Sequence, residues 1–124
     1  MTKLLIADDE AGIRSLVRIT LKSDAYEILE AADGKQALAL AREHHPTLAL
    51  LDVMMPNLTG FEVCRALKGD PATARTAVVM LTARASDADI EEGQAAGADE
   101  YLTKPFSPQA LLRKVDEMLG RAVA

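Results

Sequence analysis

The chain has 124 residues, and its formal net charge at pH 7 is −5. Hydrophobic residues make up 49% of the chain and charged residues 27%, a balance typical of a globular protein, and we expect residues 1–124 to form a single domain. The acidic charge argues against direct contact of this domain with nucleic acid or an anionic membrane, and no run approaches the ~20 apolar residues needed to cross a bilayer.

Short apolar runs alternate with amphipathic segments along the whole chain. Several of the apolar runs are hydrophobic at nearly every position, which is typical of strands buried on both faces of a parallel sheet. The predicted strands are Lys3–Ala7, Tyr26–Ala31, Leu48–Leu51, Ala77–Leu81 and Glu100–Leu102.

The segments that follow the strands have the periodicity of helices. The stripe of the first helix is Ile13, Leu16, Val17, Thr20 and Leu21, and that of the last is Leu111, Leu112, Val115, Met118 and Leu119. Thr59 has the capping-box spacing, Asp33 stands in a comparable place, and Ser107 precedes a proline, so each is expected to cap a helix. The expected helix stops are Gly69, Gly97 and Gly120.

Five strands that alternate with five helices predict an α/β fold with a doubly wound parallel sheet, right-handed crossovers and helices on both faces. The expected strand order is the flavodoxin-like 2-1-3-4-5. We take this order from known folds with the same alternation, because the sequence alone does not determine it.

Polar residues that can carry chemistry stand at the carboxyl ends of these strands. Asp8 and Asp9 follow the first strand, Asp52 follows the third, Thr82 the fourth, and Lys104 comes just after the fifth. The carboxyl ends of parallel strands share one edge of the sheet, and ligands bind there in the crevice where the winding reverses. With the expected order, this crevice lies between the first and third strands.

Three carboxylates in one crevice need positive charge to offset their repulsion, which is roughly 4 kcal/mol for a pair of charges ~4 Å apart at an effective dielectric near 20. Lys104 supplies one positive charge, and a hard divalent cation would supply two more. Oxygen-only ligands favour Mg²⁺ over zinc. A carboxylate beside Mg²⁺ and a lysine is a plausible phosphoryl acceptor, and the Thr82 hydroxyl can donate to a phosphoryl oxygen.

Four separated motifs in this order resemble the response-regulator receiver family of two-component signalling systems, over the whole chain. They are Asp8-Asp9-Glu10, Asp52-Val53-Met54-Met55-Pro56, Leu81-Thr82-Ala83 and Tyr101-Leu102-Thr103-Lys104-Pro105-Phe106. Each motif alone is weak evidence, but all four at the ends of the expected strands are highly specific.

The resemblance implies roles for these residues. Asp52 is the expected phosphoacceptor, and the expected Mg²⁺ ligands, with Mn²⁺ as a substitute, are Asp8, Asp9, Asp52 and the backbone carbonyl of Met54. Lys104 would contact the phosphoryl group, and the bond between it and Pro105 is expected to be cis. Thr82 and Tyr101 would form a switch pair that repacks the surface of the fourth helix, fifth strand and fifth helix.

The resemblance also implies partners. A histidine kinase or a histidine phosphotransfer protein would donate the phosphoryl group, and a downstream protein or a fused output domain would receive the signal. The chain would be a monomer or a phosphorylation-dependent dimer, without independent turnover of a substrate. The single cysteine, Cys64, fits a reducing compartment, and we expect a cytoplasmic protein.

The sequence departs from the family pattern at Thr59, where similar proteins usually carry Asp or Asn. Met54 and Arg84 occupy positions that tune the phosphoryl lifetime in similar proteins, and no lifetime follows from them. A Mg²⁺-dependent phosphatase with an Asp nucleophile is an alternative, but Met54 stands where such enzymes need a second acid. A flavodoxin-like redox module is disfavoured because Asp8-Asp9-Glu10 would repel its phosphate.

The sequence is compatible with two architectures. The chain is either a stand-alone receiver that signals by protein contact or a receiver taken from a longer regulator with a DNA-binding or enzymatic output.

Overall fold

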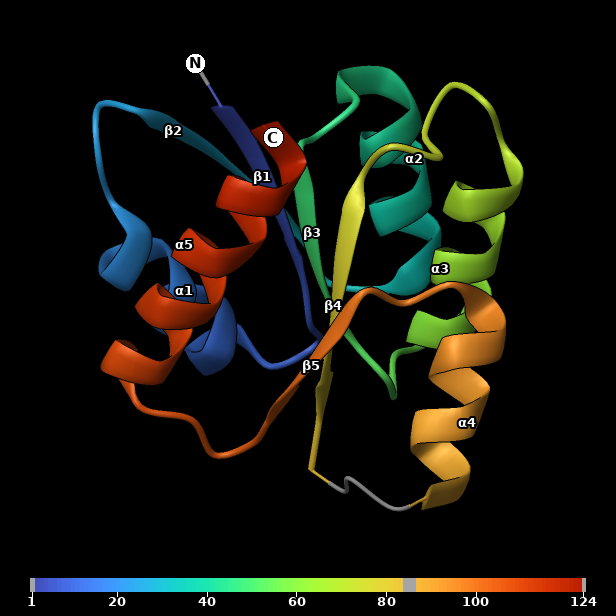
Figure 1. The fold of residues 1–124 in the computed structure, drawn as a ribbon. Coiled ribbons are helices and arrows are strands. Elements are labelled where there is room, and N and C mark those ends of the chain that lie inside the picture. Colours follow the sequence, from blue (N-terminus) through green and yellow to red (C-terminus); the bar gives the residue numbers. More distant parts are fainter. Residues whose placement is uncertain (1, 84–86, 124) are drawn as a thin grey trace.

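Five parallel strands form one sheet in the order β2-β1-β3-β4-β5, as the computed structural model shows for residues 2–83 and 87–123 (Figure 1). This confirms the expected doubly wound fold and its strand order. In chain order the elements are β1 (Thr2–Ala7), α1 (Ala11–Leu21), β2 (Tyr26–Ala31), α2 (Gly34–His44), β3 (Leu48–Asp52), α3 (Gly60–Gly69), β4 (Ala77–Thr82), α4 (Asp87–Ala96), β5 (Glu100–Thr103) and α5 (Pro108–Val123).

Two hydrophobic layers lie on either side of the sheet, because alternate residues of a strand point to opposite faces. Helices α1 and α5 cover one face, and α2, α3 and α4 cover the other (Figure 1). In β3, Leu48 and Leu50 pack with the α1/α5 layer, whereas Ala49 and Leu51 pack with the α2–α4 layer. Every residue of β3 is buried: the apolar pattern predicts this for Leu48–Leu51, and Asp52 at the end of the strand is buried as well.

The strands that carry polar residues continue through them. Asp52 pairs with Leu81, and Thr82 pairs with Thr103, in the parallel registers of β3, β4 and β5. Asp52 and Thr82 are therefore the last residues of their strands, and the sheet fixes their backbone positions.

The predicted N-terminal caps are all present. Thr59 and Glu62 form a complete capping box at α3, and the Asp33 carboxylate accepts a hydrogen bond of 2.7 Å from the Gln36 backbone N–H at α2. The Ser107 hydroxyl accepts one from the Ala110 N–H at α5. The caps at Thr59 and Ser107 fix the first turns of the helices that follow the site loops after β3 and β5.

Two predictions about α5 are wrong. The helix continues through Gly120 to Val123, because a glycine permits a left-handed turn, as at Gly97 after α4 with a φ of 95°, but does not impose one. Leu112 is 42% exposed, because the residues that point to the sheet at helical spacing are Leu111, Val115 and Met118.

Close packing at Gly60 brings the start of α3 against the end of β3. A Cβ atom at this position would lie 2.2 Å from the Asp52 carbonyl oxygen, and the Gly60 N–H donates to the Val53 carbonyl at 2.9 Å. Only glycine allows this approach, so Gly60 helps to fix the backbone at Asp52. Among the described helices, none is both long and apolar enough to span a bilayer.

Candidate functional site

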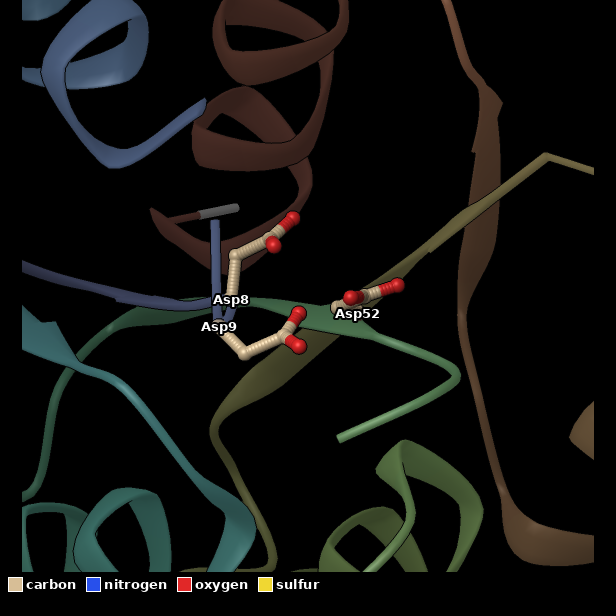
Figure 2. Close-up of side chains that lie close together, drawn as sticks. All are labelled: Asp8, Asp9 and Asp52. Carbon is tan, nitrogen blue, oxygen red and sulfur yellow. The ribbon is translucent and has the colours of Figure 1, made fainter. Parts of the chain in front are cut away.

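Three acidic side chains converge at the carboxyl edge of the sheet. Asp8 and Asp9 directly follow β1, and Asp52 ends β3, its neighbour in the sheet. One carboxylate oxygen of each lies within 4.8 Å of the other two, and Figure 2 shows the three side chains close together at this edge. The structure therefore brings together the acids that the sequence singled out.

Lys104 reaches this cluster from the loop after β5. Its Nζ lies 2.6 Å from an oxygen of Asp8, 3.4 Å from one of Asp52 and 3.8 Å from one of Glu10. The Lys104–Pro105 peptide bond is cis. Glu10 was not among the predicted site residues, although it completes the acidic run Asp8-Asp9-Glu10.

Asp8 is fully buried, and both of its carboxylate oxygens have partners. One accepts a hydrogen bond of 2.9 Å from the Glu10 backbone N–H, and the other accepts the 2.6 Å bond from Lys104. A buried charge without such partners would be strongly destabilising. Lys104 is therefore the counter-ion of Asp8 first and of Asp52 second.

The electrostatics of the site favour added positive charge. Burial, followed by repulsion from Asp8, raises the pKa of Asp52 to about 6, against the opposing attraction of Lys104. Burial acts to lower the pKa of Lys104, but its hydrogen bond to Asp8 and the charges of Asp52 and Asp8 outweigh this effect, and its pKa is raised. One ammonium group thus does not fully offset the carboxylates.

An open cleft of about 610 Å³ borders this cluster. Its lining combines the acids and the lysine with the two loops that follow β3 and β4: Asp9, Glu10, Asp52, Val53, Met54, Thr82, Ala83 and Lys104. Met54 is 73% exposed at this edge, and Arg84 lies outside the described residues. The cleft has room for a group larger than a single ion.

The donor set of the cluster is all oxygen. Carboxylates together with backbone carbonyls suit a hard divalent cation, whereas a zinc site would usually include Cys or His. The raised pKa of Asp52 points the same way, because a cation would counteract both the burial and the repulsion from Asp8 that raise it. The cluster of Asp8, Asp9 and Asp52 could therefore hold a metal ion.

Tyr101 lies away from the cleft, against α4. Its hydroxyl donates a hydrogen bond of 2.9 Å to the Ile90 carbonyl, and its ring packs with the hydrophobic layer under α2, α3 and α4. A Cβ atom at Gly93 would lie 1.6 Å from this hydroxyl. Tyr101 pairs with Met80 in the sheet, and both side chains belong to the layer under α2, α3 and α4. Thr82 follows Met80 by two residues and therefore faces the same side, so both predicted switch residues point to the α4 side.

Comparison with known proteins places this site in a family. A sequence model of the response regulator receiver domain matches residues 4–116. The chain belongs to the response regulator receiver family. The receiver therefore shares the general function of this family, which is that of a phosphorylation-dependent signalling switch.

Two curated relatives match this chain over only part of their own length. The transcriptional regulatory protein ResD of Bacillus subtilis is 44% identical over 121 residues, which are 98% of this chain and 49% of that protein. The phosphate regulon regulator PhoB of Pseudomonas aeruginosa is 42% identical over 118 residues, which are 95% of this chain and 52% of that protein. The receiver thus spans about half the length of these curated relatives.

Solved receiver structures have the same overall fold as this chain. The chemotaxis response regulator CheY4 of Vibrio cholerae superimposes with a TM-score of 0.89 at 39% identity, covering 95% of this chain and 98% of that one. A CheY-like receiver domain protein of Methanospirillum hungatei gives a TM-score of 0.91 at 30% identity, covering 98% and 96%.

Proposed function

We propose that this receiver is a phosphorylation-activated switch of a two-component phosphorelay, and that Asp52 accepts the phosphoryl group. The observation that carries the proposal is the position of Asp52 at the edge of the cleft. Its carboxylate is 3.4 Å from the Lys104 ammonium and within 4.8 Å of the carboxylates of Asp8 and Asp9. An acceptor needs a fixed backbone and nearby positive charge, and Asp52 ends a buried strand beside Lys104.

The donor in this proposal is a phosphohistidine of a histidine kinase or a histidine phosphotransfer protein. A carboxylate oxygen of Asp52 forms a bond to phosphorus while the bond from phosphorus to the imidazole nitrogen breaks. The imidazole retains the electron pair of that bond and takes up a proton from solvent. Lys104 and the Thr82 hydroxyl stabilise the charge on the phosphoryl oxygens, because both line the same cleft.

Asp8, Asp9, Asp52 and the backbone carbonyl of Met54 would hold Mg²⁺, with Mn²⁺ as a substitute. The all-oxygen donor set supports this choice. When bound, the cation supplies charge neutralisation to the phosphoryl oxygens.

The readout of the switch would be a change in partner affinity through the surface of α4, β5 and α5. Thr82 and Tyr101 would couple the cleft to this surface, since both point to the α4 side of the sheet. We propose further that residues 1–124 act as one receiver domain in the cytoplasm, without independent substrate turnover and without direct contact between this domain and nucleic acid. The partner would be a downstream protein or a fused output domain, and the receiver a monomer or a phosphorylation-dependent dimer.

Intact-mass spectrometry tests the acceptor directly. The receiver is incubated with acetyl phosphate and Mg²⁺, and we expect one adduct of about 80 Da, the mass of one phosphoryl group. Asp52→Asn should abolish the adduct. Asp116→Asn, the same change at an exposed position of α5, should leave it intact.

An adduct that persists in Asp52→Asn would contradict the assigned acceptor. Continuous hydrolysis of a generic phosphate ester, without a stable adduct, would favour the phosphatase alternative. Omission of Mg²⁺ with excess EDTA should reduce adduct formation strongly, and an unchanged rate would contradict the metal role.

A further inference from the structure

The Asp8–Asp9 peptide is held from outside the cleft by Arg14 in the first turn of α1. Its Nη1 donates a hydrogen bond of 2.7 Å to the backbone carbonyl of Asp8. This carbonyl lies just past the end of β1, where Asp8 still pairs with β2 through its N–H, which donates to Ala31 at 3.0 Å. Arg14 therefore holds the first carbonyl after the strand, immediately before Asp9.

Asp9 depends on this backbone for its orientation. The side chain is exposed, and within residues 2–83 and 87–123 its carboxylate has no hydrogen bond or ion pair. Asp8, in contrast, is fixed through both carboxylate oxygens by Glu10 and Lys104. We infer that the peptide that precedes Asp9 sets the direction of its side chain, which lies beside Asp8 and Asp52 (Figure 2).

The side chain of Arg14 is held in place by an ion pair with Glu30. Its Nε lies 3.7 Å from Glu30, which also accepts a 2.8 Å bond from Arg18 one turn further along α1. Glu30 pairs with Ile6 in the sheet, and Ile6 faces the α1/α5 layer, so Glu30 points toward α1. The Arg14 side chain is partly buried, with 21% of it exposed. A rigid, planar donor of this kind fixes a peptide orientation well.

We propose that Arg14 is a positioning residue for the cation site: by holding the Asp8 carbonyl it aims the Asp9 carboxylate into the cleft. This inference rests on the proposed function, because it assumes that Asp9 is a ligand of Mg²⁺. The positioning effect and a simple charge effect change the affinity for Mg²⁺ in opposite directions. On charge alone, loss of a nearby guanidinium should tighten cation binding, whereas loss of the positioning contact should weaken it.

Calorimetric titration with MgCl₂ alone tests this proposal on the whole chain. Arg14→Gln removes the charge and the contact with Asp8. Arg18→Gln removes the same charge from the same helix and loses the same partner, Glu30, but has no contact with Asp8. We expect Arg14→Gln to raise the Kd for Mg²⁺ about tenfold and Arg18→Gln to change it by less than about twofold.

A spectroscopic measurement separates positioning from loss of folding. The ¹³C resonance of the Asp8 carbonyl, recorded without Mg²⁺, should shift in Arg14→Gln and stay near its wild-type position in Arg18→Gln. Arg14→Lys, which keeps the charge and one donor, should give an intermediate Kd and keeps the test usable if Arg14→Gln folds poorly.

Binding of Mg²⁺ by Arg14→Gln as tight as, or tighter than, that of the wild type would overturn the proposal. An equal loss of affinity in Arg14→Gln and Arg18→Gln would do the same, because it would trace the effect to Glu30 or to general loosening of α1. If the wild type did not bind Mg²⁺ at all, the proposed function itself would fall, and this inference with it.

Discussion

At the scale of single residues, the ionised carboxylate of Asp52 destabilises the folded protein. Its carboxyl group has an ordinary pKa of 3.8, and in the folded protein this pKa rises to about 6. The folded state therefore binds the proton more tightly than the unfolded state. The resulting penalty is absent below pH 3.8, grows as the pH rises, and is complete above about pH 6.

Asp52→Asn should remove this penalty. A two-unit shift corresponds to about 3 kcal/mol, and this net shift already includes the attraction to Lys104. The Asn amide still carries part of the cost of burying a polar group, so we expect a gain of about 1–2 kcal/mol in the free energy of unfolding at pH 8. The gain should vanish near pH 4. Urea unfolding in EDTA at both pH values measures it. A variant less stable than the wild type at pH 8 would show that attraction to Lys104 outweighs burial.

Mg²⁺ should make the wild type more stable than Asp52→Asn, the reverse of the order expected in EDTA. A ligand that binds only the folded state at 100 times its Kd adds about 2.7 kcal/mol, so the wild type should gain stability with Mg²⁺ while Asp52→Asn and Asp9→Asn gain much less. EDTA should remove the gain. Thermal unfolding over a series of Mg²⁺ concentrations, with KCl at matched ionic strength as the control, measures the effect. Equal stabilisation of all three proteins would argue against binding at this cluster.

The sequence could predict which residues meet at the site, but not how they share charge. Asp8, Asp9, Asp52 and Lys104 follow strands whose carboxyl ends must lie at one edge, so their convergence follows from topology. That Lys104 contacts Asp8 at 2.6 Å and Asp52 at 3.4 Å depends on side-chain conformations that no spacing encodes. The contact of Arg14 with a backbone carbonyl leaves no sequence pattern at all, because any backbone carbonyl can accept.

At the scale of elements, the side chain of Tyr101 in β5 packs closely against Gly93 in α4. A glycine inside a helix normally costs about 0.5–1 kcal/mol relative to alanine. Here it provides the space for the Tyr101 hydroxyl, since a Cβ atom would lie 1.6 Å from that oxygen, and 2.6 Å from the ring carbon that bears it. Gly93 thus contributes to stability by leaving room for a side chain of the neighbouring strand β5.

Whether Gly93→Ala raises or lowers the free energy of unfolding should therefore depend on the side chain at position 101. In the wild-type background we expect a loss of about 1–3 kcal/mol from overpacking, and a similar loss in Tyr101→Phe, which keeps the ring. In Tyr101→Ala, the same change should add about 0.5–1 kcal/mol, because only the helix preference remains. A double-mutant cycle of urea unfolding curves measures this coupling. Stabilisation by Gly93→Ala in every background would mean that Tyr101 does not lie against Gly93 in solution.

Element boundaries show where local sequence rules were sufficient. Thr59, Asp33 and Ser107 cap helices as predicted, because a cap is a contact between residues a few positions apart. Gly120 was wrongly expected to end α5, since a glycine permits a left-handed turn but does not require one. Whether the turn occurs depends on the chain that follows.

At the scale of the whole molecule, the sheet separates two layers with different connections to the site. Asp52 pairs with Leu81, whose side chain belongs to the α1/α5 layer, whereas Thr82 and Tyr101 point to the layer that includes α4. The cleft at the edge is bordered by residues of both faces. A group bound to Asp52 can therefore act on the α4 side through Thr82 without rearranging the opposite layer.

Hydrogen exchange should reveal this asymmetry. Beryllium fluoride with Mg²⁺ places a tetrahedral phosphoryl mimic on an aspartate, and we expect amide exchange rates in the described part of α4 and in β5 to change by about fivefold or more. Amides of α1, such as those of Val17 and Leu21, should change by less than about twofold, because their layer packs against the other face of the sheet. Asp52→Asn under the same conditions should show neither change. Equal changes on both faces would mean that the signal spreads through the strands themselves, and the separation of the two layers would then carry no functional meaning.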